Sequence, residues 1–160
     1  MRILYVWDAE YPWDVRTEKI CRTLTTHGHD VVITARNRRG EARRQSLPEG
    51  IVERLPVLPG RLRSTLSFPA FFNPLWLHHL DAVARRHRSE LIIVRDLPLA
   101  PAALAAIPGL PVILDMAENY PAMIADIWTD RRSRPWDVLV RNPRIVSAVE
   151  RFTLRRVQHV

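Results

Sequence analysis

Residues 2–35 read RILYVWDAEYPWDVRTEKICRTLTTHGHDVVITA, and this stretch decides the fold. Two short apolar runs, residues 3–7 and 31–33, enclose a segment with the spacing of a helix. Asp14 suits the N-cap of that helix, and Gly28 suits the left-handed residue that ends one. The inward face of the helix is expected to contain Thr17, Ile20, Cys21 and Leu24. The stretch therefore predicts a strand, a helix and a second strand parallel to the first.

Three more runs extend this unit into a sheet. Residues 91–94 and 112–114 are apolar without alternation, which is typical of parallel strands covered by helices on both faces. Residues 51–55 mix apolar and polar side chains and predict a strand at the edge of the sheet. We therefore expect an α/β fold, a doubly wound and mostly parallel sheet flanked by helices. Counted along the chain, the five strands should lie in the order 3-2-1-4-5.

Three further helices are predicted, over residues 74–88, 99–107 and 143–158. The inward face of the last one is expected to contain Ile145, Val149, Phe152 and Val157. The Arg-rich residues 36–50 contain two glycines and a proline, and they predict a surface loop. Residues 130–142 predict a basic connection.

The composition describes a folded domain rather than a disordered tail. Of the 160 residues, 47% are hydrophobic and 26% charged, so one domain can bury a sizeable core. The lone cysteine, Cys21, excludes a disulfide framework and a cysteine-based zinc site, and it fits a reducing compartment. No apolar run approaches the roughly 20 residues that span a bilayer, and no signal peptide is recognised. We therefore expect a cytoplasmic location.

The positive charge of the chain is divided into blocks. Residues 36–63 carry a net charge of +5 and residues 131–160 carry +6, whereas residues 96–130 carry −5. Basic segments that alternate with an acidic one do not form the continuous basic face of a nucleic-acid-binding protein. The sequence therefore predicts no nucleic-acid partner.

Polar side chains gather in three loops that follow predicted strands, at residues 8–16, 95–98 and 115–121. Ligands of parallel sheets bind beyond the carboxyl ends of the strands. The loops combine carboxylates, amides, hydroxyls and aromatic rings, and this combination suits a polyol such as a sugar. Asp14 serves equally well as a simple helix cap, so both interpretations of that residue stay open.

Other common sites are excluded by residue type. All five glycines lie outside the loop after the first strand, so the dinucleotide-binding fingerprint is absent. The single lysine, Lys19, lies inside the first helix, so a phosphate-binding P-loop is absent too. The sequence has no Gly-x-Ser-x-Gly elbow, and no third ligand stands near its histidine pairs. We predict no metal site.

The order and spacing of the motifs resemble the N-terminal half of GT-B-fold glycosyltransferases, especially the family-4-like retaining enzymes. Asp14-Val15-Arg16-Thr17-Glu18 is similar to the start of the family's first helix, and Gly28-His29-Asp30-Val31 to its end. The loop Asp115-Met116-Ala117-Glu118-Asn119-Tyr120-Pro121 resembles the family's Asp-x-His-Glu-x-x-Pro loop, with Ala117 where His is common. Residues 8–10 also depart from the family, because many relatives have paired glycines there.

The resemblance implies one half of a two-domain enzyme. Residues 1–160 would form the N-terminal Rossmann-like domain, which binds the acceptor, and a C-terminal domain absent from this chain would bind the nucleotide sugar. The implied reaction moves a sugar from that donor to a hydroxyl of a glycan or lipid-linked sugar, as in polysaccharide biosynthesis. The nucleotide sugar is a substrate, and no further cofactor is implied. This segment alone is expected to be inactive.

The same resemblance suggests site residues. Asp14, Arg16 and Asp96 are expected to contact the acceptor, with the arginine fork gripping an anionic group. Glu118 and Asn119 are expected to contact hydroxyls near the transfer site and are the candidates for a catalytic role. Asp115 is interpreted as an anchor for its own loop.

Residues 61–76 mix arginines with aromatic rings, as segments at a membrane surface do. Phe71, Phe72 and Trp76 are therefore candidate contacts to an anionic membrane, which would make the protein peripheral on the inner membrane face. The alternative is that these rings pack against the sheet.

Two other functions stay open at this point. Nucleotide-sugar 2-epimerases are built from two domains of the same kind, so the chain could be half of such an enzyme. A non-catalytic basic binding module is the other alternative.

Overall fold

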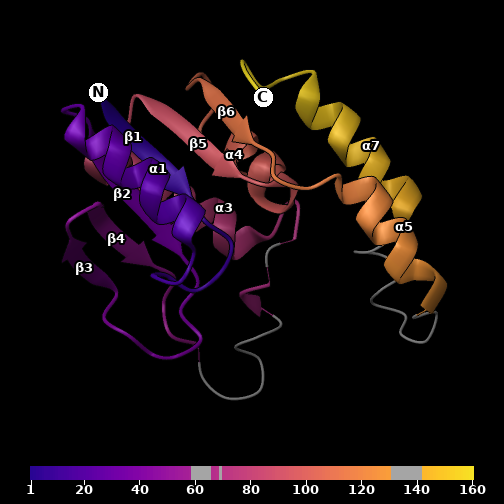
Figure 1. Ribbon diagram of the computed structural model, residues 1–160, viewed down its shortest axis with the longest axis horizontal. Helices are drawn as coiled ribbons and strands as arrows, with labels where there is room; N and C mark the ends of the chain where they lie inside the picture. The colour runs from indigo at the N-terminus through magenta and orange to yellow at the C-terminus, as the bar shows by residue number, and fades with distance from the viewer. Residues whose placement is uncertain (59–65, 69, 131–141) are drawn as a thin grey trace.

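The computed structural model describes residues 1–58, 66–68, 70–130 and 142–160. This part contains a six-stranded sheet in the order β3-β4-β2-β1-β5-β6 (Figure 1). The strands are β1 Arg2–Val6, β2 Asp30–Ala35, β3 Arg44–Leu47, β4 Gly50–Arg54, β5 Leu91–Arg95 and β6 Val112–Asp115. Neighbouring strands are parallel except β3 and β4. The α/β fold is confirmed, and the predicted strands have the predicted order.

The strand β3 corrects two predictions. It lies within residues 36–50, which were predicted to be a loop, and it pairs antiparallel with β4. The strand β4 therefore has neighbours on both sides and does not form the edge. The sequence carries no signal for β3 because it is only four residues long and exposes Arg44, Gln45 and Ser46. An apolar pattern is absent from a strand that buries neither face.

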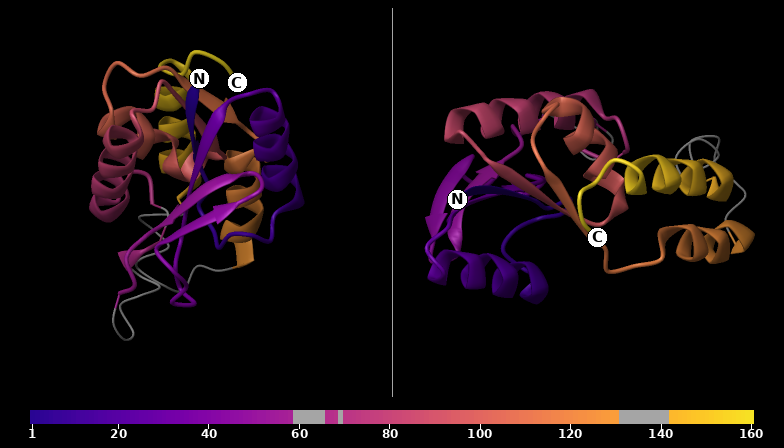
Figure 2. Two further views of the ribbon diagram at one scale, coloured as in Figure 1. Left: turned by 90° about the vertical axis from the view of Figure 1, so that its left-hand side faces the viewer. Right: turned by 90° about the horizontal axis from the view of Figure 1, so that it is seen from above.

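Helices cover both faces of the sheet. The helix α1 (Val15–Thr26) lies on one face, and α3 (Pro74–His87) and α4 (Ala100–Ala106) lie on the other (Figure 2). The short 3₁₀ helix η1 (Leu97–Leu99) joins β5 to α4. As predicted, the Asp14 carboxylate caps α1 by accepting from the Thr17 N–H, and Gly28 follows its end at φ 80°.

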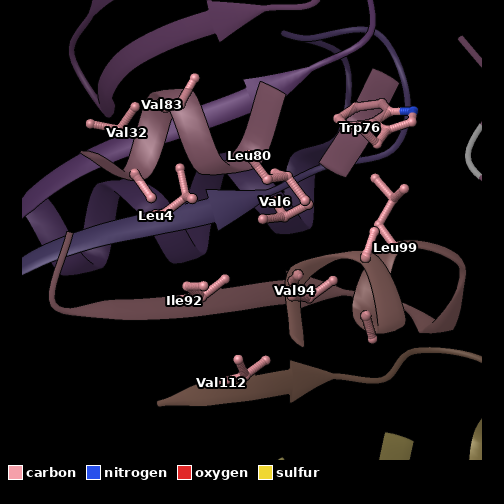
Figure 3. Close-up of a cluster of buried hydrophobic side chains, with 14 of the residues drawn as sticks. Leu4, Val6, Val32, Trp76, Leu80, Val83, Ile92, Val94, Leu99 and Val112 are labelled. Carbon is pink, nitrogen blue, oxygen red and sulfur yellow. The ribbon is translucent and has the colours of Figure 1, made fainter. Parts of the chain in front are cut away.

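Alternate residues of the central strand β1 supply the two cores. Leu4 and Val6 pack toward α3 and α4, whereas Ile3 and Tyr5 pack toward α1. Figure 3 shows the first of these cores, with Trp76 of α3 beside it. Trp76 is completely buried, and its indole N–H donates to the Ser67 carbonyl at 3.2 Å. The prediction that Trp76 contacts a membrane is therefore wrong, because this ring packs inside the domain.

Two helices lie side by side beyond the carboxyl ends of β5 and β6 (Figures 1 and 2). They are α5 (Tyr120–Asp130), which was not predicted, and α7 (Pro143–Leu154). They meet through Ile124 and Val146, with Leu97 beneath them. Residues 131–141, most of the predicted basic connection, lie outside the described residues.

The inward face predicted for the last helix is confirmed at Val149 and Val157, which pack against buried clusters, and is wrong at Ile145. Val146 and Thr153 are buried, whereas Ile145 is exposed. A shift of one residue rotates a helix face by about 100°. The buried side of α7 faces α5 and η1, and Val146 takes the inward position that was predicted for Ile145. After α7, the chain returns to the sheet, where His159 pairs with Ile113 of β6.

Phe71 and Phe72 have different surroundings. Phe71 is partly buried against the cluster of Ile124 and Val146. Phe72 is 49% exposed, and its ring meets the edge of Phe152 at 6.0 Å between centroids. Of the three rings predicted to touch a membrane, Phe72 is thus the one on the surface. Residues 61–65 and 69 of the predicted membrane segment lie outside the described residues.

Candidate functional site

Three loops converge at the carboxyl edge, the edge of the sheet formed by the carboxyl ends of its parallel strands. They follow β1, β5 and β6, which are neighbours in the sheet. The chain leaves β1 toward α1 on one face and leaves β5 toward α4 on the other (Figure 2). The connections diverge at this point, which is where open α/β sheets bind their ligands.

Arg95 joins these loops. Its Nη1 donates to the Asp14 carboxylate at 3.1 Å, and its Nε lies 3.5 Å from the Asp96 carboxylate. The guanidinium also lies 5.1 Å from the ring centroid of Trp7, within the range of a cation–π contact. Although burial opposes it, the carboxylates of Asp14 and Asp96 raise the pKa of Arg95. Arg95 therefore stays charged and holds the start of α1 against the end of β5.

Asp115 makes a second contact with the start of α1. One of its oxygens accepts from the Tyr5 hydroxyl at 3.1 Å, and the other forms an ion pair with Arg16. Burial, followed by the charge of Asp115, raises the pKa of the Tyr5 hydroxyl. The side chain of Arg16 remains about half exposed. The interpretation of Asp115 as an anchor agrees with these contacts, and Arg16 is positioned by it.

Asp96 combines burial with an unusual backbone. Its φ of 64° and ψ of 166° lie in a region that is essentially restricted to glycine. Its carboxylate accepts from the Ala117 N–H at 2.8 Å, which ties the loop after β5 to the loop after β6. Such strain persists only where surrounding contacts fix it, and it concentrates at functional sites.

Asp8 is a site residue that the sequence did not single out. It follows the central strand β1, and burial, then the nearby Asp96 carboxylate, raises its pKa to about 6. Arg36 and Arg95 act in the opposite direction. Burial also raises the pKa of Tyr120, which lies near Asp8 and Asp96. Near neutral pH, the Asp8 carboxyl can exchange a proton or accept a hydrogen bond from a hydroxyl.

The two candidate catalytic residues lie at the rim of this network. Glu118 and Asn119 are both exposed. The Asn119 side chain accepts from the Ala122 N–H at 3.2 Å, so it caps the first turn of α5. Glu118 hydrogen bonds to none of the described residues, which leaves its carboxylate available to a ligand.

The structure therefore brings Asp14, Arg16 and Asp96 into one network and leaves Glu118 and Asn119 beside it. The sequence analysis missed Asp8 and Arg95 as site residues. Their position at the ends of strands could have marked them as candidates. Their contacts could not be predicted, because these depend on the register of the strands. Within the described ranges, no group of three or more His, Cys, Asp or Glu side chains could hold a metal ion.

Residues 14–160 match the model of the glycosyl transferase 4-like domain. The chain belongs to this family. The resemblance to GT-B-fold, family-4-like glycosyltransferases is thereby confirmed, and glycosyl transfer is the general chemistry of the family. Residues 1–13, which include Asp8 and Trp13, precede the matched span.

Solved structures support the same fold. Sucrose-phosphate synthase from Thermosynechococcus elongatus aligns with a TM-score of 0.68 at 12% identity, over 98% of this chain and 40% of that chain. A second chain of sucrose-phosphate synthase from this organism gives 0.55 at 11% identity, over 97% and 98%. At these identities the likeness shows the fold alone. No curated protein sequence matches the chain.

Proposed function

We propose that this chain is the acceptor-binding half of a glycosyltransferase that uses a nucleotide sugar. The acceptor is a hydroxyl of a glycan or a lipid-linked sugar. The observation that carries the proposal is the network of Asp8, Asp14, Asp96, Arg95 and Asp115 at the carboxyl edge of a glycosyl transferase 4-like domain.

The charge of the network favours the acceptor over the donor. Four carboxyl groups face three arginines, Arg16, Arg36 and Arg95, so the net charge of the site repels a diphosphate. Carboxylates accept hydrogen bonds from sugar hydroxyls. The donor diphosphate then needs positive or N–H groups from elsewhere, and a second Rossmann-like domain is the source that we propose. The chain spans 40% of the first sucrose-phosphate synthase chain above, which leaves room for such a domain in a longer protein.

The chemistry assigned to this half is the positioning of the acceptor. In the transfer, the acceptor oxygen bonds to the anomeric carbon, the nucleoside diphosphate leaves, and the acceptor oxygen loses its proton. Asp8 and Glu118 hold acceptor hydroxyls by accepting hydrogen bonds, and Asp96 fixes the loop that carries Glu118. Without the second domain, this half does not turn over. We assign no nucleophile to it.

We also propose peripheral contact with an anionic membrane on the cytoplasmic side, through Phe72 and the exposed face of α7. Phe72 meets Phe152, whose ring carries the Arg156 guanidinium at 3.9 Å. Within the described residues, no helix is both long and apolar enough to cross a membrane. Cosedimentation of the natural protein with vesicles containing anionic lipid tests this contact. Phe72→Ser should reduce binding, and unchanged binding would contradict it.

The test of the main proposal uses the natural protein in full length. Labelled nucleotide sugars are offered with sugar and lipid-linked acceptors, and transfer of label is measured. We expect transfer, and we expect no transfer from the 160-residue segment alone. Robust turnover by the segment would contradict the two-domain assignment. Epimerised donor formed without any acceptor would replace the proposal with a nucleotide-sugar 2-epimerase.

A further inference from the structure

Trp13 combines an exposed side chain with an unusual backbone conformation. It lies in the loop between β1 and α1, and with 73% exposure it is the most exposed of the large hydrophobic side chains described. Its φ of 151° lies in the region that L side chains rarely adopt. Its indole N–H has no acceptor among the described residues. A strained backbone thus holds an indole in solvent, where burial contributes little to stability.

The chain is fixed on both sides of Trp13, at Tyr11 and at Asp14. On one side, the buried Tyr11 donates its hydroxyl to Glu49 at 2.9 Å, and its carbonyl accepts from Arg54 at 2.9 Å. On the other side, Asp14 caps α1 and holds Arg95. The contacts of these flanking residues over-determine the backbone of Trp13. The fold therefore fixes the position of the indole at the carboxyl edge.

A second loop reaches the same indole. The Arg39 guanidinium lies 5.5 Å from the ring centroid of Trp13. Its neighbour Arg38 is tied to Glu10 through a backbone hydrogen bond of 2.9 Å and an ion pair of 3.7 Å. Arg39 itself makes no ion pair within the described part of the chain. An aromatic face and an available guanidinium thus stand together, one residue away from the carboxylate of Asp14.

We propose that Trp13 and Arg39 form a subsite for an anionic sugar, which is a phosphorylated sugar or a uronic acid. The C–H face of the ring packs on the indole, and the phosphate or carboxylate binds the guanidinium fork. This inference rests on the proposed function, since it places an acidic sugar of the acceptor in the subsite.

The charges set the direction of such an acceptor. The carboxyl groups of Asp8, Asp14 and Asp96 repel an anion, and Arg39 attracts it. The charged end therefore lies at Trp13 and Arg39, and the uncharged hydroxyls extend toward Asp8 and Glu118. An acceptor bound in this direction presents a hydroxyl, rather than its anion, to the transfer site.

Binding to the natural full-length protein tests the subsite. The probes are glucose 6-phosphate, glucuronate and methyl glucoside, measured by calorimetry. We expect the two anionic sugars to bind more tightly than methyl glucoside. Trp13→Ala should weaken all three probes about tenfold, the effect of one aromatic contact, and Trp13→Phe should keep most of the affinity. Arg39→Gln should weaken only the anionic pair, by about tenfold.

Two controls separate the subsite from other effects. His27→Ala removes an exposed ring at the far end of α1 and should leave sugar binding unchanged. Trp13→Gly removes the ring and the strain together, so it should raise the melting temperature while weakening the sugars. This result would show that lost binding does not come from misfolding.

The outcomes distinguish this inference from the proposed function. If Trp13→Ala and Arg39→Gln bind the probes as tightly as the natural protein, or if the natural protein binds none of the probes, the inference is wrong. Loss of vesicle binding by Trp13→Ala with unchanged sugar binding would assign the indole to a membrane instead and also overturn it. If sugar binding behaves as expected but no nucleotide sugar supports transfer, the subsite stands and the proposed function fails.

Discussion

The two edges of the sheet differ in which residues adopt positive φ values. At the amino edge, formed by the amino ends of the parallel strands, positive φ values fall on Gly28, Gly50 and Gly109, and on Arg88, which adopts the ordinary left-handed conformation of a helix C-cap (φ 51°, ψ 48°). At the carboxyl edge they fall on Trp13 and Asp96 as well as on a glycine. Glycine adopts this conformation without a steric cost, whereas other residues do so at a cost of roughly 1–3 kcal/mol. Trp13 and Asp96 thus hold non-glycine side chains in costly backbone conformations at the carboxyl edge, beside the candidate site.

The charges of the two edges differ in the same way. The amino edge has a cavity of about 340 Å³, lined in part by Arg2, Thr25 and His87. Those groups already have partners, which are Glu90 for Arg2, Glu53 for His87 and two backbone carbonyls for Thr25. At the carboxyl edge, Asp8 lies near another carboxyl group and has a raised pKa. Arg2 and His87 are each paired with a carboxylate, so this hollow is a weaker candidate site than an edge with unbalanced charge, although Ser89 Oγ there has no hydrogen-bond partner among the described residues.

The largest effect is expected at the amino edge, from Gly50→Ala. A Cβ at this position would lie 2.4 Å from the Val31 carbonyl oxygen, and φ is 142°. Strain and overpacking against rigid backbone should together lower the free energy of unfolding by about 4 kcal/mol. Urea unfolding of the full-length protein measures this loss. Gly28→Ala is the matched control, because its Cβ meets nothing within 4 Å, and it should cost only about 1 kcal/mol.

At the carboxyl edge, Asp96→Gly should reduce activity rather than stability. Glycine relieves the backbone but removes the hydrogen bond to the Ala117 N–H and the charge beside Arg95. The loop that carries Glu118 then loses its position, and we expect kcat/KM for sugar transfer to fall about 100-fold.

Arg88→Gly is the matched control for this variant. Arg88 follows α3 at φ 51°, at the amino edge, so relief of strain there should add about 1 kcal/mol of stability without changing activity. Full activity of Asp96→Gly would mean that the strain at Asp96 has no functional role, and the contrast between the two edges would break.

Asp8→Asn tests the charge of Asp8 through the pH dependence of stability. The folded protein binds the Asp8 proton more tightly, with a pKa of about 6, than the unfolded chain does at 3.8. Stability from this group is therefore complete below about pH 4 and is lost as pH rises to about 6. Asn removes this loss, so the variant should be more stable than the natural protein by roughly 2 kcal/mol at pH 7 and equal to it below pH 4.

The activity of the same variant gives a second measurement. Transfer by the natural protein should rise through about pH 6 as Asp8 ionises, and transfer by Asp8→Asn should be lower and lack this step. Asp81→Asn, a surface carboxylate paired with Arg85 on α3, is the control. An unchanged step at pH 6 in Asp8→Asn would assign that titration to another group.

The same contrast explains what could be predicted from the sequence. The runs at residues 91–94 and 112–114 and the capped helix α1 were predictable because burial and capping leave local patterns. The helix α5 was missed because its apolar side packs against α7 instead of the sheet. Its apolar residues therefore could not be matched to the predicted strands. The meeting of Asp8, Arg95 and Asp96 depends on the register of β1 against β5 and on one glycine-like φ. Neither is visible in residue spacing.

The smallest effect is expected at Asp14, where it decides between a helix cap and a site residue. Asp14→Ser keeps a side-chain oxygen for the Thr17 N–H but loses the ion pair with Arg95, whereas Asp14→Ala loses both. Ala should lower the free energy of unfolding by about 1 kcal/mol and Ser by only a few tenths. If the ion pair positions Arg95, both variants should raise KM for the acceptor by a similar factor. If Ser behaves like the natural protein in both measurements, Asp14 is a cap alone, and the network at the carboxyl edge begins at Arg95.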